Sequence, residues 1–282
     1  MKDDRASRTA ERVAERRAAH QVLDKPVVFD DPLAMAIIDP EAARHLRDNP
    51  REFDRSPLAP FFRAAFAARS RFAEDELREA YARGVRQYVV LGAGFDTFAY
   101  RNPLAGLRVF EIDHPATQAA KCARLAAAAI PIPPETVFVP VDFARMSLAA
   151  ALDAAGLDRG APAFFSWLGV VPYLERQAIE STLRFVAALP AGTTIVFDYG
   201  SPPSALSLVG RIAFQRIAKR VAAAGEPWKT FFAPDDLATM LRACGFSQVT
   251  NCGPAEINRR YFTGRTDRLR IGEMLQIAKA IV

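Results

Sequence analysis

Two glycines and an acid stand where a small ligand could be held. In "YVVLGAGFDTFAYR", residues 88–101, an apolar run ends at Gly92 and Gly94, and Asp96 follows. Glycines directly after a buried strand let the backbone approach a ligand closely. A dinucleotide fingerprint requires a third glycine where Thr97 stands, and Asp96 would repel a pyrophosphate. The turn therefore favours a phosphate-free ligand with a positive amino-acid end, such as S-adenosylmethionine.

Two further acids follow successive apolar runs. Asp113 ends "VFEID", about twenty residues after the turn, and could accept hydrogen bonds from both hydroxyls of a ribose. Glu111 is its rival, although alternation along a strand lets only one of the two face the rim of a pocket. Asp142 follows "VFVPV" and could accept from an adenine amino group. Each acid alone could equally cap a helix or form a turn, but their order at successive strand ends favours a nucleoside site.

The elements that would position these residues alternate between strands and helices from residue 85 onward. This pattern indicates βαβ units and a mostly parallel sheet covered on both faces, an α/β Rossmann-like fold. Helices are expected over residues 114–129, 174–189 and 234–246. Strands are expected within residues 86–94, 107–113, 136–143, 161–170 and 192–200, with "SQVTNCG" and "RRYFTG" as closing strands.

Residues 1–84 are predicted to be a helical cover, and residues 85–282 the main domain. "RTAERVAERRAAHQVL" consists of strong helix formers. Asp30 or Asp31 could cap a short helix that Pro32 opens. A long helix follows and should end at Gly84. Residues 200–232 interrupt the alternation after the fifth strand, and we interpret this insertion as a lid above the ligand crevice.

The composition limits the classes of partner. A net charge of +5 is mildly basic and spread out, which suits a small acidic substrate better than nucleic acid. Three cysteines without a CxxC pair and no metal-ligand spacing predict neither disulfides nor a metal site. A charged start and the lack of a long apolar run predict a cytoplasmic protein with no membrane partner. One basic cluster could be a solvated surface or a site for an anionic substrate: Arg259, Arg260, Arg265, Arg268 and Arg270.

Over nearly its whole length the chain resembles the leucine carboxyl methyltransferase-like, S-adenosylmethionine-dependent methyltransferases, including many actinobacterial members. The resemblance is carried by "RTAERVAERRAAHQ…FDDPLA", "VVLGAGFDTFAYR", "VFEIDHPATQAAKCARL", "VPVDF", "FFSWLGVVPYLE" and "FDYG". It implies a Rossmann-like class I methyltransferase with a seven-stranded sheet, an N-terminal helical extension and an insertion after the fifth strand. The implied cofactor is S-adenosyl-L-methionine.

The resemblance also assigns cofactor contacts position by position. It implies that Gly92 and Gly94 approach the methionine part of the cofactor. It implies that Asp113 binds the ribose, and that Asp142 and Phe143 surround the adenine.

Arginines complete the implied cofactor site, and one position departs from the family pattern. Arg69 matches a base that holds the cofactor carboxylate, for which a guanidinium fork is suited. Arg17 matches a second such base, with Arg16 as a competitor. Leu168 stands where family members often have a glutamate, which predicts a more apolar pocket. Trp167 could line that pocket or belong to the core.

The chemistry expected is methyl transfer to an acceptor that the protein positions. No His–Asp pair is nominated as a base, and His114, before a proline, is expected to start a helix. This favours an already ionised oxygen such as a carboxylate, and the function expected is O-methylation of a carboxylate or hydroxyl of a small molecule or peptide. Tyr173 and Tyr199 are positioning candidates, and Tyr261 could contact substrate, with packing as the alternative for each. A non-catalytic cofactor-binding module and a nicotinamide-dependent oxidoreductase are the rival functions.

Overall fold

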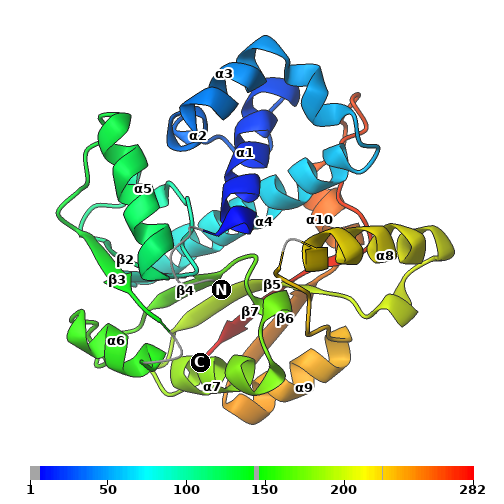
Figure 1. The fold of residues 1–282 in the computed structure, drawn as a ribbon. Coiled ribbons are helices and arrows are strands. Elements are labelled where there is room, and N and C mark those ends of the chain that lie inside the picture. The colour runs from blue at the N-terminus through cyan, green and yellow to red at the C-terminus, as the bar shows by residue number, and fades with distance from the viewer. Residues whose placement is uncertain (1–6, 143–145, 224) are drawn as a thin grey trace.

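The computed structural model describes residues 7–142, 146–223 and 225–282. Its centre is a seven-stranded sheet in the order β3-β2-β1-β4-β5-β7-β6 (Figure 1). β7 pairs antiparallel with β5 and β6, and the other neighbours pair in parallel. The predicted mostly parallel sheet is therefore confirmed. The strands are β1 (Gln87–Leu91), β2 (Arg108–Asp113), β3 (Thr136–Pro140), β4 (Phe164–Trp167), β5 (Thr194–Gly200), β6 (Gln248–Cys252) and β7 (Leu275–Ile281).

Helices cover both faces of the sheet, so its central strands are apolar on both sides. α6 (Leu148–Ala154), α7 (Arg176–Ala187) and α9 (Pro234–Cys244) pack on one face. α4 (Ala59–Ala82) and α10 (Pro254–Tyr261) pack on the other. α7 buries Ile179, Leu183 and Val186, as their spacing predicts. α9 ends at Gly245, whose φ of 114° is in the left-handed region where glycine carries no steric penalty.

The N-terminal segment is helical, as predicted, and packs against the sheet domain. α1 (Arg8–Leu23), α2 (Ala34–Ile37), α3 (Pro40–Asp48) and α5 (Pro115–Ala127) share an apolar cluster with Phe95. The predicted cap of the short helix is wrong, because α2 begins after Leu33 and no side chain caps it. Asp31 instead accepts a hydrogen bond from the Leu33 N–H within the preceding turn.

The prediction of a closing strand at "RRYFTG" is wrong. Residues 259–261 end α10, which opens at Pro254 and buries Ile257. The last strand is β7 instead, which the sequence reading did not assign. Its alternation is masked by Lys279, which the fold accommodates because Nζ lies 2.7 Å from Glu76 Oε2 on α4.

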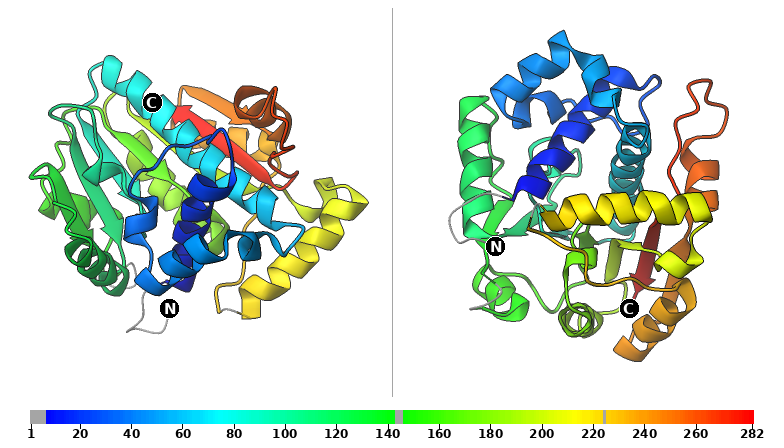
Figure 2. Two further views of the ribbon diagram at one scale, coloured as in Figure 1. Left: turned by 90° about the horizontal axis from the view of Figure 1, so that it is seen from above. Right: turned by 45° about the vertical axis from the view of Figure 1, so that its right-hand side comes forward.

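The insertion after β5 carries a helix of its own, α8 (Leu208–Ala223), as its length predicts. The left-hand view of Figure 2 shows α8, in yellow, at the edge of the molecule, and none of its residues is buried. Within the described ranges no helix has the length and apolar character needed to cross a bilayer. Across the same residues no group of three His, Cys, Asp or Glu side chains is placed to hold a metal ion.

Candidate cofactor and acceptor site

The glycine turn follows β1 at the point where the strand order reverses. The N–H groups of Gly92 and Ala93 both donate to the carbonyl of Ile112, at 2.9 Å each, and this ties the turn to β2. Gly92 has a φ of 72°, and a Cβ placed there would lie 2.4 Å from Val170 Cγ2. Only glycine therefore fits this position without displacing the loop after β4.

Asp113 connects the end of β2 to the glycine turn. Its Oδ2 accepts from Gly94 N–H at 2.6 Å, and its Oδ1 accepts from His114 N–H at 2.7 Å. Burial raises the pKa of this carboxyl, and the two backbone N–H groups oppose that rise. Since an ionised carboxylate has about four acceptor positions, the side chain keeps capacity for further hydroxyl donors.

Glu111, the rival of Asp113, lies in the interior. It is 1% exposed, and its Oε2 accepts from Lys121 Nζ at 2.7 Å and from Tyr100 Oη at 2.9 Å. Burial raises the pKa of this carboxyl as well, and Lys121 opposes the rise. The expectation that alternation separates the two acids is wrong, because residues two positions apart lie on the same face of a strand. Asp113 differs because it is the last residue of β2 and is partly exposed, whereas Glu111 is buried within the strand.

Asp142 follows β3, and the Val141 N–H donates to the carbonyl of Asp113 at 2.8 Å. The edge that carries Asp113 therefore continues directly to Asp142. Phe143 lies outside the described residues.

Arg69 reaches the same edge from α4. Its Nη1 donates to Asp198 Oδ2 at 3.0 Å, and its guanidinium stacks 4.6 Å above the Phe66 ring. A Cβ placed on Gly169 would lie 2.7 Å from Arg69 Nη2. Asp198 Oδ1 also accepts from Gly169 N–H at 2.5 Å. Gly169 contacts Arg69, and the next residue, Val170, contacts Gly92. The loop after β4 therefore joins Arg69 to the glycine turn.

Asp198 is a candidate site residue that the sequence did not predict. Its signal was a single acid inside the apolar run "TIVFDYG" of β5. A carboxylate that is 4% exposed needs a charged partner, and Arg69 is that partner.

Of the two N-terminal candidates, the structure brings Arg17 to the glycine turn. Arg17 Nη2 donates to the carbonyl of Phe95 at 2.6 Å, and its Nε lies 2.8 Å from the buried Asp31. Arg16 points instead to α4, where its guanidinium lies 5.1 Å above the Phe62 ring. Arg17 therefore holds the backbone of the glycine turn in place through Phe95.

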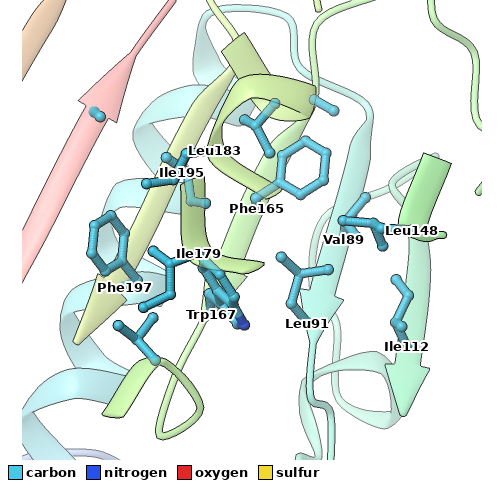
Figure 3. Close-up of a cluster of buried hydrophobic side chains, with 14 of the residues drawn as sticks. Val89, Leu91, Ile112, Leu148, Phe165, Trp167, Ile179, Leu183, Ile195 and Phe197 are labelled. Atoms are coloured by element: carbon cyan, nitrogen blue, oxygen red, sulfur yellow. The ribbon is translucent and has the colours of Figure 1, made fainter. Parts of the chain in front are cut away.

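Three of the aromatic candidates are packed or bonded away from the turn. Trp167 is 3% exposed and lies in the core among Ile179, Phe197 and Leu91, as Figure 3 shows. Tyr199 is 1% exposed and donates to Asn251 Oδ1 at 2.9 Å. Tyr261 donates to Asp75 Oδ2 on α4 at 3.1 Å. The burial of Trp167 and Tyr199 agrees with the packing alternative, whereas Tyr261 is only partly buried and its substrate contact stays a prediction. Leu168 packs against the apolar cluster on the α4 face.

Tyr173 differs, because it lies between the sheet edge and the insertion. Burial raises the pKa of its phenol, which also interacts with Trp228, Arg69 and Asp198. The segment after α8 holds the loop of Tyr173, since the Lys229 N–H donates to the carbonyl of Pro172 at 2.7 Å.

A His–Asp pair is present in the N-terminal segment, at His20 and Asp24. His20 Nδ1 lies 2.8 Å from Asp24 Oδ2, and His20 Nε2 accepts from the Val28 N–H at 2.9 Å. Both ring nitrogens are engaged and the side chain is fully buried, so the pair is structural. His114 caps α5 by accepting from the Ala116 N–H, as predicted.

The sheet order and the glycine turn at the switch point define a Rossmann-like class I methyltransferase fold. Two solved structures share this fold. One is a DUF574 family protein from Streptomyces avermitilis, 18% identical, with a TM-score of 0.57 over 98% of this chain and 97% of that chain. The other is a protein from Thermobifida fusca named as a methyltransferase, 16% identical, with a TM-score of 0.57 over 99% and 96%.

The comparison of sequences is more specific. Residues 10–187 match the leucine carboxyl methyltransferase family model, and the chain belongs to this family of S-adenosylmethionine-dependent methyltransferases. YktD of Bacillus subtilis, named as such a methyltransferase, is 30% identical over 303 residues, covering 100% of this chain and 99% of the relative. A Mycobacterium protein (strain JLS) with the same designation is 32% identical over 232 residues, covering 79% and 72%. The cofactor is thus S-adenosylmethionine, and the nicotinamide alternative is set aside.

Proposed function

We propose that this protein methylates an oxygen of a small molecule or peptide, preferentially a carboxylate, with S-adenosylmethionine as donor. The observation that carries the proposal is the junction at the sheet edge. Asp113 is bonded to Gly94, Val170 packs on Gly92, and the loop of Val170 holds Arg69. These contacts join Asp113, the glycine turn and Arg69 through the loop after β4, which supports a common cofactor site.

The residues fit the cofactor by chemical type. Asp113 offers a carboxylate acceptor to the ribose hydroxyls, and Gly92 and Gly94 leave the backbone open to the methionine part. Arg69 has one nitrogen committed to Asp198, and its planar fork can present another to a carboxylate. Asp142 is the acceptor proposed for the adenine amino group. When bound, the cofactor supplies an electrophilic methyl group on a sulfonium.

The preference for an ionised oxygen follows from the positions of the histidines, which are the usual general bases of enzymes. Of the three histidines of the chain, His20 pairs with Asp24 and His45 pairs with Glu52. His114 follows Asp113, but its Nδ1 accepts from the Ala116 N–H as the cap of α5. A carboxylate acceptor has no proton to lose near neutral pH, whereas an alcohol needs a base. The protein then has to align the two reactants, which can be worth about 7–11 kcal/mol for well-oriented groups.

Tyr173 is the acceptor-positioning residue of this proposal. Burial raises the pKa of its phenol, so the hydroxyl stays protonated and can donate to an acceptor oxygen. We interpret residues 200–232 as the cover of the acceptor. Ser7 Oγ, before α1, donates to Glu226 Oε1 at 3.3 Å, so the N-terminal segment and the insertion are in contact, which supports a shared cover.

Calorimetry with S-adenosylhomocysteine and with NADH tests the cofactor site. We expect binding of the first only, weakened roughly ten- to a hundred-fold by Asp113→Ala, as one or two charged hydrogen bonds are lost. Asp39→Ala is the matched control, because Asp39 Oδ1 also accepts two backbone N–H groups but caps α3, far from the turn. Equal binding by Asp113→Ala and wild type would overturn the ribose role.

Transfer of labelled methyl groups to a panel of carboxylates, phenols, alcohols and amines tests the acceptor class. We expect label in base-labile methyl esters, and a lower kcat in Tyr173→Phe without loss of S-adenosylhomocysteine affinity. Label found only on nitrogen or carbon would refute the oxygen assignment. Tight cofactor binding without any turnover would favour the non-catalytic module.

A further inference from the structure

A hollow of about 670 Å³ lies outside the cofactor site, between the start of α4, α10 and the loop before β7. Its size falls in the range of small-molecule pockets. Phe61, Phe262 and Leu269 supply apolar surface, and three arginines of the basic cluster complete the lining: Arg265, Arg268 and Arg270. The combination of an apolar floor and several cations suits an amphipathic anion.

The arginines of the cluster differ in whether their charge is already matched. Arg259 pairs with Glu256 at 2.6 Å, Arg260 lies 3.5 Å from Glu76, and Arg265 makes two hydrogen bonds to Asp267. Arg265 also donates to the carbonyl of Pro26, so it is fixed within the wall of the hollow.

Arg268 and Arg270 are the two whose charges remain available. Neither has a carboxylate within ion-pair distance among the residues that the structure describes, and both are exposed. The Arg270 guanidinium lies 6.0 Å from the centre of the Phe61 ring, at the limit of a cation–π contact, which leaves its N–H groups free for a ligand.

The backbone holds Arg268 in an unfavourable conformation. Its φ is 59°, in the left-handed region that is sterically unfavourable for a residue with a Cβ. The turn is held there by Asp267 Oδ1, which accepts from the Leu269 N–H at 3.1 Å. Asn258 fixes the end of the loop through two hydrogen bonds to Ile271. A glycine would relieve this strain, and an arginine stands there instead, beside the hollow.

We infer that this hollow is a second ligand site, which binds an oxyanion, phosphate or carboxylate, attached to an apolar body. Arg268 and Arg270 hold the anionic group by charge-assisted hydrogen bonds, with Arg265 as a fixed neighbouring cation. The apolar body packs on Phe61, Phe262 and Leu269. None of these residues belongs to the proposed cofactor site, so the two sites can be tested separately.

Titration of the ¹⁵N-labelled full chain with phenyl phosphate tests the inference. We expect amide shifts concentrated in residues 258–271, weaker binding of inorganic phosphate, and no binding of phenol at the same concentration. Raising the ionic strength should weaken the binding, because the site is at the surface. Repeating the titration with phenylacetate, which carries a carboxylate, shows whether the site prefers a phosphate or a carboxylate group.

A double variant, Arg268→Gly with Arg270→Ala, tests whether these two arginines bind the anion. Glycine at position 268 removes the guanidinium and suits the left-handed backbone there. We expect affinity for phenyl phosphate to fall by about ten-fold or more. Arg259→Ala is the control, because that arginine belongs to the same cluster but pairs with Glu256. The inference is overturned if the double variant binds as wild type does, if both variants lose affinity equally, or if the shifts lie elsewhere. Asp113→Ala should bind phenyl phosphate normally, which separates this result from failure of the proposed function.

Discussion

Substituting Gly92 by alanine tests the packing of the cofactor turn. Two separable costs arise at this position. The first is the backbone, because a φ of 72° lies in the left-handed region and costs alanine about 1–2 kcal/mol. The second is steric, because the new Cβ would lie 2.4 Å from Val170 Cγ2. Ordinary contacts begin at 3.4 Å, so the loop after β4 must give way by about 1 Å.

Overpacking of this kind costs about 1–3 kcal/mol, so we expect Gly92→Ala to lower the free energy of unfolding by about 2–5 kcal/mol. Gly106→Ala separates the two costs. Gly106 has a nearly equal φ of 69°, and a Cβ there would meet nothing within 4 Å. Gly106→Ala should therefore lower the free energy of unfolding only by the backbone cost, about 1–2 kcal/mol.

Val170→Ala provides the rescue, since it removes the Cγ2 atom that the new methyl would meet. The next atom, Val170 Cβ, is 3.7 Å away and tolerable. Urea titration of the two single variants and the double variant gives the coupling energy. In the Val170→Ala background, Gly92→Ala should cost about as much as Gly106→Ala. A Gly92→Ala cost no larger than that of Gly106→Ala in the wild-type background, or a failure of rescue, would refute the packing assigned to this turn.

Lys121→Met leaves the buried Glu111 without its cation, and a loss of about 3–5 kcal/mol in unfolding free energy is expected from urea titration; a loss below about 1 kcal/mol would contradict a charged pair. Arg69→Lys keeps the charge but loses the planar fork, so S-adenosylhomocysteine affinity should fall about ten-fold by calorimetry, and unchanged affinity would rule out its cofactor role. Because burial raises the pKa of Asp113, its protonation on acidification begins at a higher pH than in an ordinary aspartate. Cofactor affinity should therefore be full above that pKa and decline as the pH falls through it. A pH-independent affinity down to the range of an ordinary aspartate would contradict this assignment.

The elements that the sequence predicts correctly are those whose pattern is local. The run "YVVL" is buried throughout in β1, and α7 places its apolar residues on one face. β7 could not be recognised in this way, because Lys279 interrupts its alternation and is neutralised by Glu76 on a distant helix. The same applies to "RRYFTG", whose aromatic residues suggest a strand while Pro254 opens a helix just before them.

In the candidate site, too, the residues that could be predicted are those with a local sequence pattern. Asp113 could be predicted because its neighbours in sequence place it at a strand end. The role of Asp198 depends on Arg69, which lies 129 positions away along the chain, and no local pattern contains that pair. Trp167 is a case in which the sequence left two alternatives open, a pocket wall or the core, and its side chain at the end of β4 packs against the Phe197 ring.

The first N-terminal helix, α1, contacts the glycine turn directly. Arg17 on α1 donates to the carbonyl of Phe95 inside the glycine turn, and a Cβ on Gly94 would lie 3.2 Å from Ala10 Cβ. The start of α1 also reaches α5, since the Ser7 N–H donates to Thr117 Oγ1 at 3.2 Å. A ligand held against Gly94 must therefore share its surroundings with α1. The family match begins at residue 10 and so includes most of this helix. The boundary at residue 84 stays a prediction, and we expect a truncation before it to disturb the glycine turn through the loss of these contacts.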